Sequence, residues 1–195
     1  MFDFPPLSEA PPASLEEALL QTKRLFLQAG LEGAEVFATR PPEPAQALRG
    51  ACLEATIPVG SLETVAHREA CALAASQGVK ISHTRLSVQD DGDGACSLKL
   101  GVELGVRVFG ATVTLRVGGR AEASDGENIR CRELQLDAGS GLFAGMATAL
   151  IRPRLDALEG REFNLSQIAG VPVRLLRLEC TGASGETLRI GLRFV

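Results

Sequence analysis

Residues 96–123, which read CSLKLGVELGVRVFGATVTLRVGGRAEA, decide the fold of this chain. Every even position from Cys96 to Val108 is apolar, and every odd position between them is polar or glycine. After a turn at Phe109-Gly110, apolar and small residues alternate with polar ones up to Ala123. Because successive side chains of a strand point to opposite faces, this pattern predicts an antiparallel hairpin of two long strands with one apolar and one polar face.

Helices and further strands flank this hairpin. A preceding strand is predicted at residues 79–88, where the apolar positions change from odd to even and so indicate a bulge. The other main elements are an Ala-rich helix at 61–77, a strand at 128–138, a long amphipathic helix at 142–159 and a closing hairpin at 173–195. Together they predict an α+β fold with a long-stranded, strongly curved antiparallel sheet packed around or against one or two long helices.

The first 50 residues differ in character from the rest of the chain. They are rich in proline and contain one predicted helix, which begins after Ser14 at capping-box spacing from Glu17. We therefore expect residues 1–50 to be a Pro-rich N-terminal helical appendage. It is expected to pack on a main domain formed by residues 51–195.

The composition excludes several classes of function. The chain of 195 residues is 45% hydrophobic, carries a formal net charge of −4, and contains eight Phe but no Trp or Tyr. This charge gives no field that attracts nucleic acid, and the missing aromatic residues argue against stacking platforms for bases or sugars. No stretch reaches the roughly 20 apolar residues that span a bilayer, and no signal peptide is expected. The five scattered cysteines predict reduced, mostly buried thiols and a cytoplasmic location.

A search for catalytic and ligand-binding motifs finds no constellation. The chain has no nucleophile elbow, no phosphate-binding glycine loop and no dinucleotide fingerprint. Its two histidines, His67 and His83, have no second ligand at metal spacing, so structural or surface roles are expected. The run DDGDG at 90–94 lacks the last ligand and the flanking helices of a calcium loop, and we interpret it as a hairpin loop. We therefore expect no enzyme activity, no metal and no cofactor.

The aliphatic stripe is the feature that points to a function. The apolar faces of the long strands and two helices form either a filled core or a core with a slot left open for an acyl chain. The expected lining of such a slot consists of Leu100, Val102, Leu104, Val113, Leu115, Met146 and Leu150. The same residues would form the core of a filled domain, so the pattern leaves both interpretations open.

In the order of their elements, residues 60–195 resemble a tubular lipid-binding (TULIP) unit, the module of the bactericidal/permeability-increasing proteins. The resemblance lies in the helix at 61–77, the long strands through 95–123, the helix at 142–159 and the hairpin at 173–195. It implies a strongly curved sheet wrapped around a long helix, with lipid held in an apolar seam. The expected function is therefore non-catalytic binding of a lipid, a fatty acyl chain or another long hydrophobic ligand, with peripheral membrane contact as a related expectation.

Basic residues support further interpretations. Arg152, Arg154 and Arg161, near the end of the long helix, are expected either to contact a headgroup or partner or to complement the negative end of the helix dipole. The polar face of the strands carries Lys99, Arg107, Arg116, Arg120, Arg177, Arg189 and Arg193 against Glu103, Glu122 and Glu179. The alternative function is a protein–protein interaction or scaffold domain that uses this face or an edge strand, including self-association into a homo-oligomer. A solvated face of mixed charge explains the same residues.

Overall fold

The computed structural model describes residues 12–39, 48–75, 80–91, 96–108, 110–123, 125–140, 142–169, 171–181 and 186–195. The turn of the closing hairpin predicted at 173–195 and most of the loop at 90–94 lie outside these residues. Within the described part of the chain, no helix combines the length and the apolarity needed to cross a membrane.

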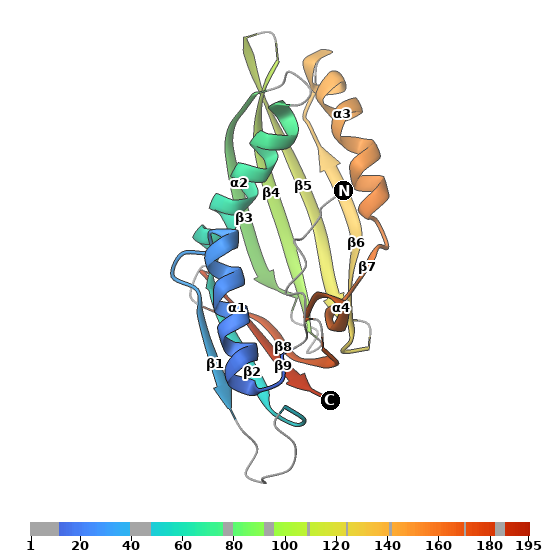
Figure 1. The fold of residues 1–195 in the computed structure, drawn as a ribbon. Helices are drawn as coiled ribbons and strands as arrows, with labels where there is room; N and C mark the ends of the chain where they lie inside the picture. The colour runs from blue at the N-terminus through green and yellow to red at the C-terminus, as the bar shows by residue number, and fades with distance from the viewer. Residues whose placement is uncertain are drawn as a thin grey trace.

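Helices and strands follow one another in an order close to the predicted one (Figure 1). The helices are α1 (Leu15–Ala29), α2 (Val59–Ala75), α3 (Leu142–Leu158) and the short α4 (Leu165–Ala169). The strands are β1 (Glu35–Thr39), β2 (Cys52–Pro58), β3 (Lys80–Asp90), β4 (Ser97–Val108), β5 (Ala111–Ala123), β6 (Asn128–Asp137), β7 (Glu162–Asn164), β8 (Val173–Thr181) and β9 (Thr187–Phe194).

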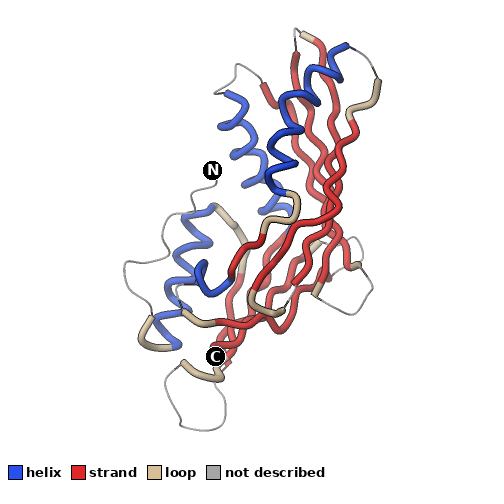
Figure 2. Tube along the Cα trace, turned by 90° about the vertical axis from the view of Figure 1, so that its right-hand side faces the viewer, coloured by secondary structure: helices blue, strands red, loops and turns tan. Residues whose placement is uncertain are grey.

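The strands form two antiparallel sheets rather than a single one. Sheet A has the order β1-β2-β9-β8, and sheet B has the order β3-β4-β5-β6-β7. The three long helices all lie on the same side of these sheets (Figure 2). The predicted α+β, antiparallel class is confirmed. The division into two sheets was not predicted, and it arises because the closing β8–β9 hairpin pairs with β2 instead of extending the ladder of β3 to β6.

Sheet B contains the predicted hairpin. β4 pairs with β5 from Ser97–Glu122 to Val108–Ala111, so that Val102 lies opposite Val117. The bulge predicted from the change of phase in β3 is also present, as a shift of register between Ile81 and His83. Both features follow from the period-2 pattern, because side chains that must face one core determine the register.

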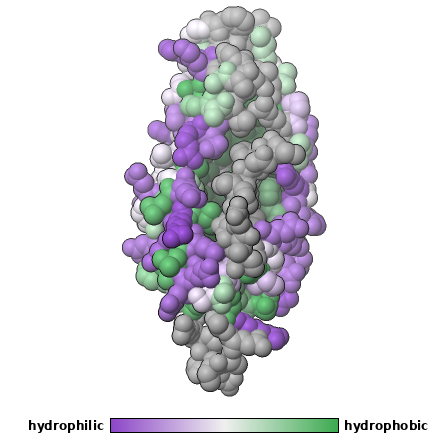
Figure 3. Space-filling model, viewed as in Figure 1, coloured by the Kyte–Doolittle hydropathy of each residue, from purple (hydrophilic) through white to green (hydrophobic). Residues whose placement is uncertain are grey.

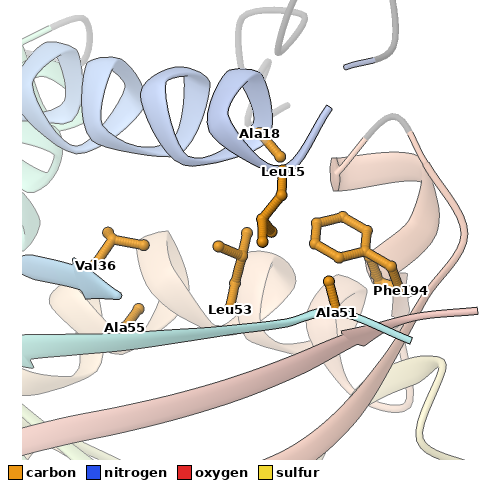
Figure 4. Close-up of a cluster of buried hydrophobic side chains, with 8 residues drawn as sticks. Leu15, Ala18, Val36, Ala51, Leu53, Ala55 and Phe194 are labelled. Atoms are coloured by element: carbon orange, nitrogen blue, oxygen red, sulfur yellow. The ribbon is translucent and has the colours of Figure 1, made fainter. Parts of the chain in front are cut away.

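Sheet A carries α1 and encloses a filled core. Ser14 caps the helix by accepting a hydrogen bond from the Glu17 backbone N–H at 3.2 Å, and Gly30 ends it with φ of 77°. Figure 4 shows Leu15 of α1 pointing toward Leu53 of β2 and Phe194 of β9, and all three side chains are buried. β1 pairs with β2, so residues on both sides of position 50 contribute to this sheet. A domain boundary at that position stays a prediction.

The five cysteines are free and half-buried. Their expected burial was therefore too deep. Burial raises the pKa of the Cys131 thiol, with a smaller contribution from the Glu159 carboxylate, and burial followed by the Asp90 carboxylate does the same for Cys180. These thiols are disfavoured as nucleophiles, since the thiolate is the reactive form.

Candidate functional site: an apolar pocket over the middle of sheet B

Contacts with the helices establish which face of sheet B is covered. His67 of α2 lies 3.0 Å from the Thr84 hydroxyl of β3, measured from its Nδ1 atom. Ala147 of α3 packs in one cluster with Val106 of β4 and Leu115 of β5. By strand alternation, the even positions of β4, the even positions of β3 after its bulge and the odd positions of β5 therefore face the helices.

Both ends of this face are filled by apolar clusters. At one end Val106, Leu115 and Ala147 are 3%, 0% and 1% exposed. At the other end Val88 and Leu98 of sheet B are buried against side chains of sheet A, namely Leu175 and Leu178 of β8. The aliphatic stripe of β4 thus begins and ends in well-packed core.

Among the described residues, the side chains in the middle of the face are less covered than those at its ends. Leu86, Val102 and Val117 lie side by side in the register of β3, β4 and β5, and each is only partly buried. Among the described residues, Val102 and Val117 belong to neither of the clusters that fill the ends. A pocket of about 530 Å³ lies here, and Figure 3 shows the helix-bearing face hollowed above apolar atoms.

The pocket is open because the two helices are held at opposite flanks of the sheet (Figure 1). On one flank Glu63 of α2 accepts a hydrogen bond, at 2.8 Å, from the backbone N–H of Leu86 in the edge strand β3. On the other flank Glu159, directly after α3, accepts from the N–H groups of Glu133 and Leu134 at 3.0 and 2.8 Å. These two N–H groups lie at a bulge of β6, where Glu133 has φ of 57°. α2 therefore packs on β3, while α3 packs on β5 and β6 and reaches β4 at Val106, and the two helices leave part of β4 and β5 between them uncovered.

Glu63 is the charged side chain on the helix-bearing face of the pocket, among the described lining residues. Arg85, Glu103 and Arg116 also border the pocket, but alternation directs their side chains to the opposite face. There Arg116 donates to Glu103 at 3.0 Å and lowers the pKa of that carboxyl. Among the described lining residues, the side chains that remain on the pocket face are aliphatic apart from Glu63.

The seven side chains predicted to line a slot lie in different parts of the structure. Val102 is the one found among the described pocket-lining residues. Leu100 packs against the cluster shared with sheet A, while Leu104, Val113 and Leu115 belong to the cluster below α3. Met146 of α3 is 43% exposed, and the side chain of Leu150 lies outside the described part of the structure. A lining role for these other residues stays a prediction.

Sequence reasoning missed Glu63 and Leu86 as pocket residues. Leu86 follows a bulge, so its face could be assigned only after the register was known. Nothing in the sequence singled out Glu63, because a single glutamate in an amphipathic helix is ordinarily solvated. Val117 was part of the alternating pattern, but its register position opposite Val102 distinguishes it from its buried neighbour Leu115.

The described contacts do not bring together the arginines that were predicted to contact a headgroup. Arg152 pairs with Asp156 one turn along α3, at 3.2 Å. Arg161 lies over the ring of Phe163, 5.2 Å from its centroid, and the side chain of Arg154 is not among those described. Their predicted role in ligand or partner contact is untested.

The polar face of the strands carries internal ion pairs. Lys99 and Arg120 contact the Asp91 carboxylate at 2.9 and 2.6 Å. Arg177 reaches Glu54 at 3.2 Å across Gly191, whose missing side chain leaves room for it. Arg107, Arg189 and Arg193 are exposed. The polar face of the strands is thus a mixture of paired and solvated charges spread over two sheets.

Metal chemistry has no candidate centre in the described chain. Within it, no group of three or more His, Cys, Asp or Glu side chains is placed to hold an ion. His67 contacts Thr84 and lies 3.6 Å from the Cys71 sulfur, measured from Nε2, while His83 lies 3.5 Å from Glu103.

Comparisons with known proteins add one distant structural match. No family model and no curated protein matches the sequence. Among solved structures, a crystal structure of lipopolysaccharide binding protein superposes with a TM-score of 0.27 and 8% sequence identity, over 86% of this chain and 41% of that chain. This chain therefore spans less than half of that protein, and the assignment of the site rests on the geometry above. The resemblance to the tubular lipid-binding fold stays a prediction.

Proposed function

We propose that this chain binds a lipid or another long apolar molecule, without catalysis, in the pocket over the middle of sheet B. One observation carries the proposal. Leu86, Val102 and Val117 form a continuous apolar row in which none is fully buried, and Val102 and Val117 lie outside the two clusters that fill the ends of the face. The pocket volume of about 530 Å³ falls in the range of about 300–1,000 Å³ that is common for small-molecule sites.

The physical reason for binding is the apolar surface that the row leaves in contact with water. Complete burial of a valine or leucine side chain contributes about 1.5–3 kcal/mol relative to full exposure. Leu86, Val102 and Val117 have realised only part of this gain, because they are half-buried. An aliphatic chain laid over them would remove the remaining surface from water.

Native mass spectrometry of gently purified protein tests for a bound lipid directly. Binding is then measured after delipidation with diphenylhexatriene, an uncharged hydrocarbon whose fluorescence rises when it leaves water. We expect saturable binding at one site. We also expect a large loss of affinity in Val102→Phe, whose ring would occupy the pocket.

Thr112→Phe is the matched control, since Thr112 is an exposed residue on the opposite face of the hairpin. It adds a ring to the protein without adding one to the pocket. If Val102→Phe and Thr112→Phe bind the probe equally well, the pocket is not the binding site.

A further inference from the structure

We infer that the pocket selects amphiphiles that carry a protonated amine headgroup. This inference rests on the proposed function, because it concerns the polar end of a ligand whose apolar part lies over Val102 and Val117. It is carried by Glu63, which is among the residues that line the pocket and whose carboxylate binds the backbone of Leu86 in the apolar row.

The Glu63 side chain is held in place at this wall. Its Oε2 atom accepts the Leu86 N–H at 2.8 Å, on the outer side of an edge strand, so the carboxylate is tied to the sheet as well as to α2. Leu86 is itself part of the apolar row. A ligand chain that contacts the Leu86 side chain therefore touches the residue whose backbone N–H this carboxylate binds.

The carboxylate retains unused acceptor capacity. Two carboxylate oxygens offer about four acceptor positions. Among the described residues, the Leu86 N–H is the contact that this carboxylate makes. A partly buried anion with one backbone donor is incompletely compensated, and a donor brought by a ligand would supply the missing hydrogen bonds.

The described cations near the pocket are directed elsewhere. Arg116 belongs to the opposite face, where it pairs with Glu103 at 3.0 Å, and alternation places Arg85 on that face too. Arg68, on α2, donates to the Ala29 carbonyl at the end of α1 and pairs with Glu69. The charge presented to a ligand is therefore negative, which favours an ammonium group and disfavours carboxylate or phosphate headgroups.

Three amphiphiles with the same chain separate headgroup selection from apolar binding. Dodecylammonium, dodecanol and dodecanoate are titrated below their micellar concentrations against the wild-type protein loaded with diphenylhexatriene. A hydrogen bond to a charged group contributes about 1.5–3 kcal/mol, so we expect dodecylammonium to displace the probe at about tenfold lower concentration than dodecanol, or lower still. Dodecanoate should be the weakest of the three.

Two substitutions on the same helix assign the preference to one carboxylate. Glu63→Gln retains an acceptor for the Leu86 N–H and removes the charge, so it should abolish the preference for the ammonium probe. Glu69→Gln removes the same charge from a residue that pairs with Arg68, and it should retain the preference.

Equal displacement by all three amphiphiles would overturn the headgroup assignment and leave apolar binding intact. A preference that survives Glu63→Gln would overturn it as well. If none of the three displaces the probe from the wild-type protein, the apolar pocket fails together with the headgroup, and this outcome is distinct from the other two.

Discussion

Sheet A and sheet B start from the same kind of strand pattern and end with different interiors. On sheet A, α1 places Leu15 among residues of β1, β2 and β9, and the resulting cluster is closed. On sheet B, two helices cover the flanks, and the row through Val102 and Val117 stays half-exposed. An alternating strand therefore defines an apolar surface, whereas the position of the covering helix decides whether that surface becomes core or pocket.

Simple dimensions explain the difference. A helix with its side chains is about 10–12 Å wide, and neighbouring strands are about 4.8 Å apart, so one helix covers roughly two strands. Two helices could cover the four long strands of sheet B if they lay in contact. Glu63 and Glu159 instead tie them to backbone N–H groups of β3 and β6, the outer two of these strands. The uncovered strip lies between them.

The largest expected effect contrasts the closed end of the stripe with its open middle. Leu115→Ala should lower the free energy of unfolding by about 2–5 kcal/mol, because it leaves a cavity in a fully enclosed site. Val102→Ala should cost less than about 1 kcal/mol, because its side chain already borders empty space. Urea denaturation of both variants measures the difference. Similar losses in the two variants would mean that the middle of the stripe is as well packed as its end.

Substitutions that enlarge a side chain test the same contrast from the opposite direction, and the expected change in stability is somewhat smaller. Ala147→Leu should destabilise the protein by about 1–3 kcal/mol, because this alanine is 1% exposed where α3 meets the sheet. Val117→Leu adds a methylene toward the pocket and should change the stability by no more than about 0.5 kcal/mol. Thermal unfolding monitored by circular dichroism provides the comparison. A marked loss in Val117→Leu would show that no free space exists beside it.

The next effect is the dependence of stability on pH, which we expect to come from the face of sheet B away from the helices. On that face, Lys99 makes the largest contribution to holding the pKa of Asp91 below its usual range. Burial opposes it, and Arg120 and Ser97 add smaller contributions in the same direction as Lys99. Because the folded-state pKa is lowered, this carboxylate stabilises the fold above the unfolded-state pKa of about 4, and the stabilisation is lost as the pH falls through the folded-state value.

Asp91→Asn should therefore be less stable than the wild type at neutral pH and should show a flatter loss of stability below about pH 4. Urea midpoints measured from pH 7 to pH 2 test this. Asp156→Asn, in an exposed pair with Arg152, is the control, and it should leave the loss of stability at low pH unchanged. If Asp91→Asn and the wild type lose stability identically at low pH, Asp91 does not contribute to the acid dependence.

The smallest expected effect concerns the outer side of α3. Arg152→Ala removes an exposed pair with Asp156 and should cost at most about 0.5 kcal/mol. The same variant tests the predicted headgroup contact, since an unchanged affinity for an anionic amphiphile would exclude Arg152 from that role. A large loss of stability would mean that this side of α3 is packed more tightly than its exposure indicates.

Much of the fold could be predicted from local patterns. The alternation through residues 96–123 determined the hairpin and its apolar face, the change of phase in the preceding strand indicated the bulge, and Ser14 indicated the beginning of α1. Each of these depends on residues close together in the chain. The division into two sheets depended on the choice of β2 as the partner of β9, a pairing between segments far apart in the chain, which periodicity does not encode.

The candidate site was accessible from sequence only in part. The apolar stripe that contains Val102 was evident, because side-chain period alone assigns a residue to a face. Tertiary structure decided which part of the stripe is covered, through the contact of Glu63 with Leu86, 23 residues away, and of Glu159 with β6. The physical reason is that a pocket is a place where packing is absent, and the absence depends on where distant helices are anchored rather than on the residues that form its floor.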